Sequence, residues 1–469
     1  MDMHYATSTR EMASLLQIED ELIGHMRQYA RELQLKVNTM RTFQKEWKTR
    51  REQGPADPTT YVANPLISFP LMRRMYTDAP KLMEFARQEL GQGPLQKLLE
   101  RDLTSISALE MHMAATGLIR FQGVYGLEAS EMANGKLYGT QYNSTLSSAD
   151  CFALGTHLER LQKGKLACKW LIVSVDQYND QLDPVNRLLL AGRSQIYEKL
   201  GLTLLSMHDL PASQAALKLS VACASKDDNT KLANHLIDNL AHMLVHVDNC
   251  RGKNPLSRNS SLRCSYFTES DPFLRLAPLK LEQLNHEPFI ALYHDVVLKE
   301  EQEDLLYHTR SRLEQRQVDP AGVEAEVEAN ASDHVRRLHR RIEDMTGFDL
   351  EDSKPLTVFN YGIGGQQFIH LDCEQPKEFV EPFTTKYRTV TVQLFLSDVE
   401  MGGYASFPDL KFAFKPASGS ALVWHSTDNF GNCDVRSLHA ICPVLLGTQW
   451  VARKWISGSG QWRRKPCRK

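Results

Sequence analysis

The sequence predicts a multidomain α+β protein: an N-terminal helical region, a second helical domain of tetratricopeptide-like hairpins, and a C-terminal double-stranded β-helix, or jelly roll. Three observations lead to this prediction. A heptad-like apolar repeat runs through residues 8–50, and two helical hairpins of similar length follow in the middle of the chain. Short runs rich in β-branched and aromatic residues then fill the C-terminal part. At 469 residues, the chain is long enough for about three domains.

Charge and hydropathy exclude two classes of protein. The chain has 55 basic and 57 acidic residues and a net charge of −2, whereas nucleic-acid-binding proteins usually carry a basic stripe. No apolar run approaches the ~20 residues that a membrane-spanning helix needs. The first residues, MDMHYATSTREM, show no apolar segment of the signal-peptide kind. We therefore expect no nucleic-acid partner and no membrane span.

The N-terminal region, residues 1–135, is predicted to be helical. Apolar residues recur there at spacings of three or four, which is the pattern of a coiled-coil seam: Leu15, Ile18, Leu22, Met26, Tyr29, Leu33, Val37 and Met40. The helix either self-associates through this seam or packs it within its own domain. Three prolines in REQGPADPTTYVANPL end the helix, and further helical periodicity follows.

Residues 136–246 are predicted to form the second helical domain. The segments DCFALGTHLERLQKGKLACKWLIVSVDQYN and NRLLLAGRSQIYEKLGLTLLSMHDLPASQAALKLSVACAS each have the form helix, turn, helix. Such arrays commonly bind extended peptides on their concave face. An ordinary helical bundle is the alternative.

A linker over residues 247–285 leads to the predicted jelly roll, residues 286–469. Turns such as MGG and KPASGS separate its short strands, and this spacing is typical of double-sheet folds. The strand-like runs include LTVFNYG, YRTVTVQLFLS, YASFPDL, FAFKP, SALVWHS, LHAICPVLLG and QWVARKWIS.

A histidine and an aspartate lie two positions apart in GGQQFIHLDCE, residues 364–374. In an extended strand, His370 and Asp372 would point to the same face. A solvated ion pair and a metal site are the two interpretations. His439, on a distant predicted strand, favours the metal, because two histidines and one carboxylate form the facial triad of non-haem Fe(II) oxygenases. Spacing alone leaves His425 as a rival ligand.

The nine cysteines include no CxxC pair, so a structural zinc site is not expected. Cys250 and Cys264 bracket a short polar loop, and Cys442 with Cys467 would tether the C-terminal tail, so both pairs are candidate disulfides. Glycosylation sequons occur at Asn143, Asn259 and Asn330.

Several stretches closely resemble the α subunits of animal collagen prolyl 4-hydroxylases. They are YATSTREMASLLQIEDELIGHM and ADCFALG in the helical part, and NYGIGGQQFIHLD, FLSDVEMGGYASFPD, KPASGSALVWHS and RSLHAICPVLLGTQWVARKWI in the jelly roll. The resemblance covers nearly the whole chain. It follows the family's domain order: dimerisation helices, peptide-substrate-binding helices, then the oxygenase.

The resemblance implies an activity and a set of site residues. His370, Asp372 and His439 match the family's iron ligands. The implied reaction hydroxylates peptidyl proline to 4-hydroxyproline in X-Pro-Gly sequences, using Fe(II), 2-oxoglutarate and O2, with ascorbate restoring oxidised iron. Other matches concern ligand contact and cross-links: Thr391 for 2-oxoglutarate, Arg388 and Trp455 for the proline site, and the pairs Cys250–Cys264 and Cys442–Cys467 for intrachain disulfides.

The resemblance also implies a partner and a compartment. Family members work in the endoplasmic reticulum lumen as α2β2 tetramers with protein disulfide isomerase as the β subunit. Their substrates are proline-rich, collagen-like peptides.

Departures from the family pattern concern the cosubstrate. The family has a lysine ten residues after the distal histidine that pairs with 2-oxoglutarate, but this chain has Gln449, and a neutral amide supplies no charge. The family's tyrosine before the first ligand is Gln367. Another cation, Arg453 or Lys454, would be needed, and strand alternation puts only Arg453 on the same face as Gln449. A catalytically weak peptide-binding or assembly subunit is therefore the alternative function.

Overall fold

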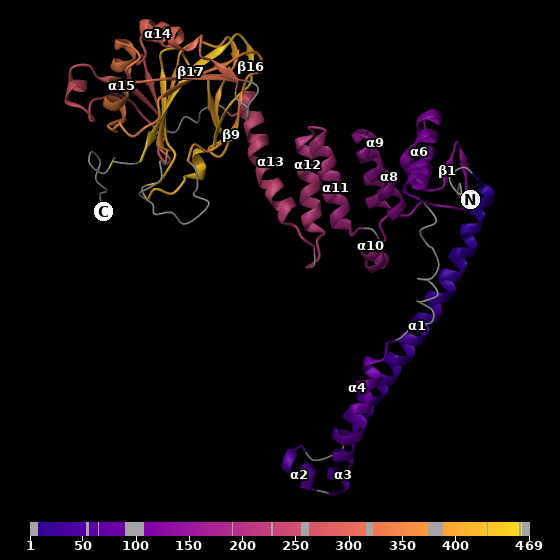
Figure 1. The fold of residues 1–469 in the computed structure, drawn as a ribbon. Helices are drawn as coiled ribbons and strands as arrows, with labels where there is room; N and C mark the ends of the chain where they lie inside the picture. The colour runs from indigo at the N-terminus through magenta and orange to yellow at the C-terminus, as the bar shows by residue number, and fades with distance from the viewer. Residues whose placement is uncertain are drawn as a thin grey trace. The chain divides into compact units, whose positions relative to one another are not determined.

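The computed structural model describes residues 8–52, 56–63, 65–89, 107–189, 191–226, 228–254, 262–315, 322–373, 388–428, 430–458 and 461. The chain divides into two compact units, Met1–Leu190 and Ala191–Lys469 (Figure 1). This division falls inside the predicted tetratricopeptide-like domain, so each unit contains one of its helical hairpins. Among the described residues, no helix has both the length and the apolar character that a membrane crossing requires.

The first unit is almost entirely helical. Its elements are α1 (Thr9–Glu52), α2 (Pro58–Ala63), α3 (Pro65–Arg73), the π-helical turn η1 (Arg74–Asp78), α4 (Ala79–Arg87), α6 (Ala108–Tyr125), α7 (Ala129–Ala133), the hairpin β1 (Lys136–Leu137) and β2 (Thr140–Gln141), α8 (Ser148–Arg160), α9 (Gly164–Asp176), η2 (Asp180–Leu182) and α10 (Asp183–Leu189).

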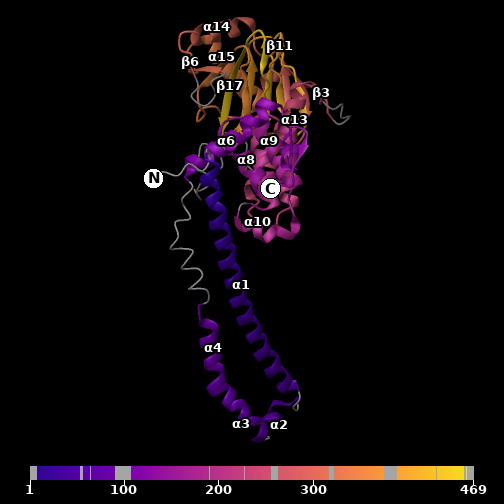
Figure 2. The same cartoon turned by 90° about the vertical axis from the view of Figure 1, so that its right-hand side faces the viewer.

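Helix α1 contains the predicted heptad seam and has no buried residue. The helix runs beside α4, as Figure 2 shows, and Lys36 of α1 donates a 2.5 Å hydrogen bond from Nζ to the Gln88 carbonyl. Several seam residues remain exposed, among them Met26, Leu33, Val37 and Met40. The described part of the chain therefore leaves every seam residue half-buried or exposed.

The two predicted helical hairpins are confirmed as α8–α9 in the first unit and α11 (Arg193–Ser206)–α12 (Leu210–Ala222) in the second. They repeat the same contacts. A serine pair 26 residues apart joins the helices of each hairpin, Ser148 with Ser174 and Ser194 with Ser220. In each hairpin a glycine also lies against a leucine of the second helix, so the two hairpins are copies of one packing unit.

Replacing Gly155 with alanine is expected to destabilise the first unit. The added Cβ would lie 2.8 Å from Cγ of Leu171, which is buried, so the two helices must move apart. Overpacking of this kind typically costs about 1–3 kcal/mol. Calorimetric unfolding should show a lower Tm for this variant. Gly117→Ala is the matched control, because nothing lies within 4 Å of its Cβ, and equal melting of the two variants would contradict the close contact.

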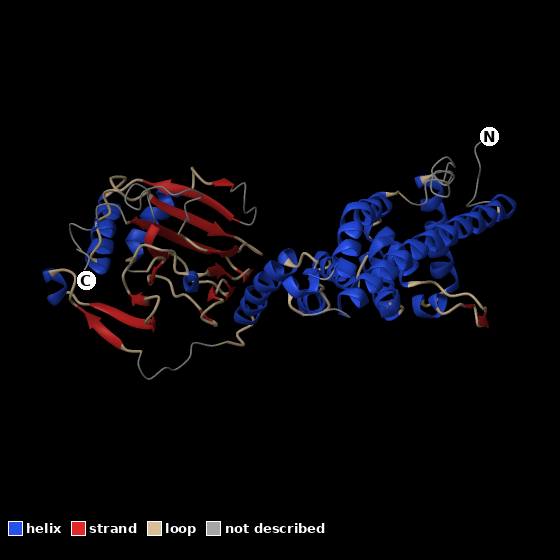
Figure 3. Cartoon of the chain, turned by 90° about the horizontal axis from the view of Figure 1, so that it is seen from below, coloured by secondary structure: helices blue, strands red, loops and turns tan. Residues whose placement is uncertain are grey.

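The second unit continues with α13 (Lys231–Cys250) and then contains nearly all the described strands, drawn in red in Figure 3. Nine strands form one sheet in the order β3-β4-β5-β14-β10-β17-β8-β7-β6, and a four-stranded sheet has the order β13-β12-β15-β9. Every pairing is antiparallel. The two sheets confirm the predicted jelly roll.

The strands of the large sheet are β3 (Cys264–Phe267), β4 (Leu279–Asn285), β5 (Ile290–His294), β6 (Glu314–Gln315), β7 (Gly322–Val327), β8 (Leu356–Tyr361), β10 (Arg388–Phe395), β14 (Ala421–His425) and β17 (Gln449–Ser457). Those of the small sheet are β9 (Gln367–His370), β12 (Ala405–Phe407), β13 (Phe412–Phe414) and β15 (His439–Ile441). The remaining elements are η3 (Pro272–Arg275), α14 (Lys299–Thr309), α15 (Asp333–Thr346), η4 (Val435–Ser437) and the pair β11 (Met401–Gly402) and β16 (Val444–Leu446).

The large sheet is buried on both faces. One apolar cluster joins it to α14 and α15 through residues such as Leu305, Leu338 and Val392. A second cluster fills the space between the two sheets and includes Phe395, Phe407 and Trp424. Because the central strand β10 is covered on both faces, six of its eight residues are buried, including Thr391 and Gln393.

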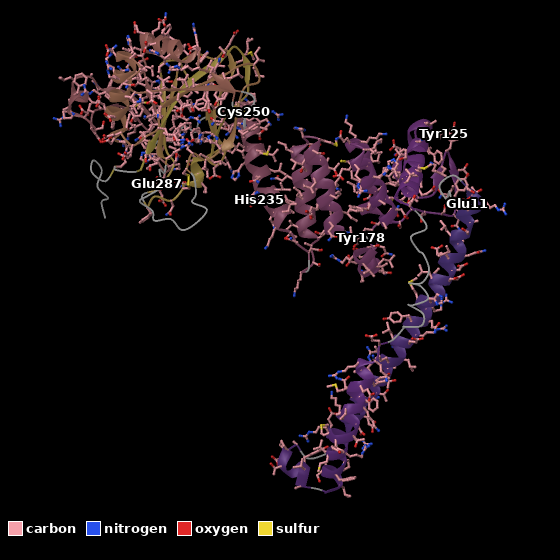
Figure 4. The ribbon with its side chains drawn as sticks, viewed as in Figure 1. Glu11, Tyr125, Tyr178, His235, Cys250 and Glu287 are labelled. Atoms are coloured by element: carbon pink, nitrogen blue, oxygen red, sulfur yellow. A yellow bond between two sulfur atoms is a disulfide. The ribbon has the colours of Figure 1, made fainter. Side chains whose placement is uncertain are left out.

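Helix α13 is joined to the small sheet. Asn249, which is fully buried, donates from Nδ2 to Ser406 Oγ at 2.9 Å and to the Phe412 carbonyl at 3.0 Å. Cys250, the last residue of this helix, is labelled in Figure 4. It forms a disulfide with Cys442, and the two Cα atoms are 5.5 Å apart.

The predicted Cys250–Cys264 disulfide is therefore wrong, and so is the pairing of Cys442 with Cys467. Cys264 is the first residue of the edge strand β3, and its thiol is free and exposed. Cys250, the last residue of α13, instead lies beside Cys442 in the loop after β15. Cys467 itself lies outside the described residues, as does the sequon at Asn259. The sequon residues Asn143 and Asn330 are exposed.

Candidate active site

Two histidines lie directly opposite each other on neighbouring strands of the small sheet. The antiparallel register of β15 and β9 pairs His439 with His370, and their ring centroids are 4.3 Å apart. Directly opposed side chains on one face of a sheet are held close by the backbone ladder itself. The sheet therefore brings together two residues that the sequence places far apart.

Asp372 completes this group from the loop that follows β9. Its Oδ1 lies 3.6 Å from His370 Nε2, and its Oδ2 lies 3.5 Å from His439 Nε2. One ligand atom from each of the three residues lies within 4.8 Å of the others, as a shared metal ion requires. Within the described residues, the His370 side chain is 30% exposed, while the Asp372 side chain is fully buried.

Backbone carbonyls orient both imidazole rings. His370 Nδ1 lies 2.8 Å from the Phe368 carbonyl, and His439 Nδ1 lies 2.9 Å from that of Ser437. A carbonyl only accepts, so Nδ1 carries the proton and Nε2 presents its lone pair. The buried Nε2 of His439 has no hydrogen-bond partner among the described residues. This tautomer and this orphaned atom are those of a metal ligand.

The charges of the group also suit a cation. Burial lowers the pKa of His439 to about 3, helped by the nearby His370, so its imidazole is neutral and free to bind. Burial alone would raise the pKa of the Asp372 carboxyl, but His439, His370 and Arg453 hold that pKa well below its usual range. The carboxylate therefore stays ionised.

Two further predicted site residues contact the Asp372 carboxylate directly. Thr391 on β10 donates from Oγ1 to Oδ2 at 2.7 Å, and Trp455 on β17 donates from Nε1 to Oδ1 at 2.8 Å. Arg388 stacks on the Trp455 ring, with its guanidinium carbon 4.2 Å from the ring centroid. Thr391, Trp455 and Arg388, which were predicted for cosubstrate and substrate contact, thus lie beside the cluster of His370, Asp372 and His439, and Thr391 and Trp455 also orient Asp372.

Gln449 is buried inside the jelly roll, and its side-chain amide already has a hydrogen-bond partner. It donates from Nε2 to the Gly403 carbonyl at 2.9 Å. The predicted orientation of Lys454 is confirmed: its Nζ donates to the Lys354 carbonyl at 2.5 Å, and the residue is packed near His339 on the other face of the large sheet. His425, the rival ligand, contacts the rings of Phe289 and Phe348 and is not part of the described cluster.

Sequence reasoning missed two features near the site. One is the hydrogen-bonded link from Arg453 through Gln367 to His370. The other is a disulfide between Cys373 and Cys433, with Cα atoms 5.7 Å apart, which ties the residue after Asp372 to the segment preceding His439. Strand parity had indicated the side of β17 on which Arg453 lies, but no local pattern indicated the disulfide.

A jelly roll with two histidines and one carboxylate converging inside it is the arrangement typical of the non-haem Fe(II) oxygenases. Comparison with known proteins finds similarity to one family. Residues 8–139 match the model described as the prolyl 4-hydroxylase alpha-subunit, N-terminal region.

Curated relatives align over nearly the whole chain. Prolyl 4-hydroxylase subunit alpha-2 of Gallus gallus is 26% identical over 520 residues, covering 99% of this chain and 95% of the relative. Subunit alpha-1 of Homo sapiens is 26% identical over 513 residues with the same coverage. Subunit alpha-2 of Caenorhabditis elegans is 25% identical over 506 residues, covering 98% and 93%. The predicted resemblance to animal prolyl 4-hydroxylase alpha subunits is confirmed.

Solved structures were also compared. The viral collagen prolyl hydroxylase of Paramecium bursaria Chlorella virus-1 is 19% identical with a TM-score of 0.32, covering 36% of this chain and 94% of that one. A Pseudomonas putida prolyl-4-hydroxylase is 15% identical with a TM-score of 0.27, covering 36% and 93%.

Proposed function

We propose that this protein hydroxylates peptidyl proline to 4-hydroxyproline in collagen-like X-Pro-Gly sequences, using Fe(II), 2-oxoglutarate and O2, with ascorbate to restore oxidised iron. The observation that carries the proposal is the convergence of His370, Asp372 and His439 inside the jelly roll. It occurs in a chain that resembles prolyl 4-hydroxylase alpha subunits over 99% of its length.

The three residues fit the metal that the proposal needs. Two imidazoles that each place Nδ1 against a backbone carbonyl, together with one ionised carboxylate, form the donor set that suits Fe(II), and three ligands on one side leave positions for other molecules. Bound there, the iron would supply the redox chemistry with O2 and 2-oxoglutarate. The protein's own residues hold Asp372 in place through Thr391 and Trp455.

Substrate would approach from the side where His370 is partly exposed. Arg388, half-buried, stacks on the buried Trp455 ring, which contacts Asp372, so the guanidinium is the part of this stack that a peptide could reach. Phe368, 59% exposed on β9 together with His370, adds apolar surface for a proline-rich chain. These residues would position the peptide, while the buried part of the site keeps water from the metal ligands.

The test is succinate release by the full chain coexpressed with protein disulfide isomerase, with and without a (Pro-Pro-Gly) peptide. We expect release that increases with the peptide and requires added Fe(II), together with 4-hydroxyproline in the product. Absence of both succinate and 4-hydroxyproline from a folded, iron-loaded protein would refute the proposal.

We further propose that the chain acts as the α subunit of an α2β2 assembly in the lumen of the endoplasmic reticulum, with protein disulfide isomerase as β subunit. Its relatives are named as alpha subunits, and the two disulfides of the second unit are typical of an oxidising compartment.

Glutamate at both Leu22 and Leu33 is expected to break the association of two copies through α1 while leaving the jelly roll folded. Both residues belong to the heptad seam, and charges in a seam must lose their hydration to pack. Sedimentation should show a smaller particle. The control carries glutamate at Gln17 and Ala30, which are exposed and outside the repeat. An unchanged particle in the seam variant would mean that α1 packs within its own chain.

A further inference from the structure

Arg453 is a fully buried guanidinium whose described hydrogen-bond acceptors are neutral. Its Nη2 donates to Gln367 Oε1 at 2.7 Å, and its Nε donates to Gln393 Oε1 at 3.1 Å. Its Nη1 is buried with no hydrogen-bond partner among the described residues. Because arginine remains charged in proteins and a buried charge is costly without a counter-ion, this group calls for an anion.

Asp372 does not meet that need once a metal is bound. Both of its oxygens accept hydrogen bonds, from Thr391 and Trp455, and both face the histidines with which it would share the metal. A divalent metal, the Asp372 carboxylate and Arg453 together leave an excess of positive charge inside the jelly roll. A dicarboxylate ligand neutralises this excess.

The other cations and polar groups along β17 do not supply the missing contact. Gln449 uses its amide nitrogen on the Gly403 carbonyl, and its buried Oε1 is an acceptor that repels a carboxylate. Lys454 points to the other face of the sheet, where it donates to the Lys354 carbonyl. Of these β17 residues, Arg453 is the cation on the side of the sheet that faces the proposed metal ligands. Its guanidinium carbon lies 5.6 Å from the ring centroid of Trp455, which contacts Asp372.

We propose that Arg453 binds the distal carboxylate of 2-oxoglutarate in this protein, in place of the lysine that Gln449 replaces, with Gln367 and Gln393 holding the guanidinium in position. The inference rests on the proposed function. Gln367 also lies 3.1 Å, Nε2 to Nε2, from His370, so the same side chain contacts both the anion-binding arginine and a metal ligand.

The test is direct binding of 2-oxoglutarate to the full chain loaded with Fe(II) under anaerobic conditions, measured by calorimetry so that no turnover is needed. Arg453→Gln is expected to weaken 2-oxoglutarate binding about tenfold or more, the range of one charge-assisted hydrogen bond. Iron retention should be unchanged. Binding of 2-oxobutyrate, which lacks the distal carboxylate, should not weaken.

Two further variants sharpen the result. Lys454→Gln, which removes a buried cation from the other face of the same strand, should bind 2-oxoglutarate like the parent. Adding Gln449→Lys to Arg453→Gln should restore most of the lost affinity. If Arg453→Gln does not fold, Arg453→Lys takes its place in the test. Lysine keeps the charge but lacks the planar fork of the guanidinium, so this variant should bind 2-oxoglutarate more weakly and 2-oxobutyrate as the parent does.

The outcomes separate the two proposals. A parent chain that retains iron but binds no 2-oxoglutarate contradicts the proposed function. A parent chain that binds 2-oxoglutarate while Arg453→Gln, or Arg453→Lys in its place, binds it equally well contradicts only the role of Arg453. An equal loss in Lys454→Gln would mean that the effect is unspecific, and it also counts against that role.

Discussion

Replacing His439 with alanine is expected to abolish iron retention and all turnover. The substitution leaves His370 and Asp372 as the remaining ligands of the described cluster, and two ligands hold Fe(II) too weakly to survive dialysis. Even the loss of a group that only orients a ligand commonly costs 10–100-fold in affinity, about 1.4–2.7 kcal/mol, and the loss of the ligand itself should cost more.

Iron content after anaerobic dialysis is the measurement. His425→Ala is the matched control, because it removes a histidine of the same jelly roll that lies outside the cluster and packs on Phe289. Iron retained by the His439 variant at the parent level would show that the metal, if any, is held elsewhere.

Removing the Cys250–Cys442 disulfide, by alanine at both positions, is expected to lower the stability of the second unit by about 2–5 kcal/mol. The bond closes a loop with a sequence separation of 192, so its loss releases a large part of the unfolded chain from constraint. Calorimetric unfolding without reductant should show a clearly lower Tm.

Cys264→Ala is the control for this experiment. Its thiol is free and exposed, so the stability of this variant should stay within about 0.5 kcal/mol of the parent. Peptide mapping of the unreduced protein provides a separate check. A peptide that links Cys250 to Cys264 would contradict the arrangement described here.

The sequence predicted those features that local patterns encode. Alternation along β17 correctly separated Arg453 from Lys454, and strand-like runs correctly predicted the jelly roll. Spacing predicted that His370 and Asp372 share one face of a strand, but β9 ends at His370 and Asp372 reaches the cluster from the following loop. Spacing also left His425 and His439 as rivals. The register of β9 with β15, which sets His439 opposite His370, is a contact between strands distant in sequence.

Disulfide pairing could not be predicted for the same reason. Four cysteines allow three pairings, and sequence proximity favoured Cys250 with Cys264. In the folded unit, α13 carries Cys250 to the small sheet, where Asn249 and Ser406 anchor it beside Cys442. The contact between Arg453 and Gln367 likewise joins strands of different sheets, so no pattern within one strand indicates it.

The exposed seam of α1 has a consequence for newly made chains. A helix of 44 residues with no buried side chain gains little from tertiary packing, so in the proposed assembly its folding depends on the concentration of a second copy. Before it meets that partner, each chain displays a row of apolar side chains that chaperones and proteases recognise. Scarcity of a partner would then lead to degradation of the chain, and the abundance of the protein would follow the rate at which copies pair.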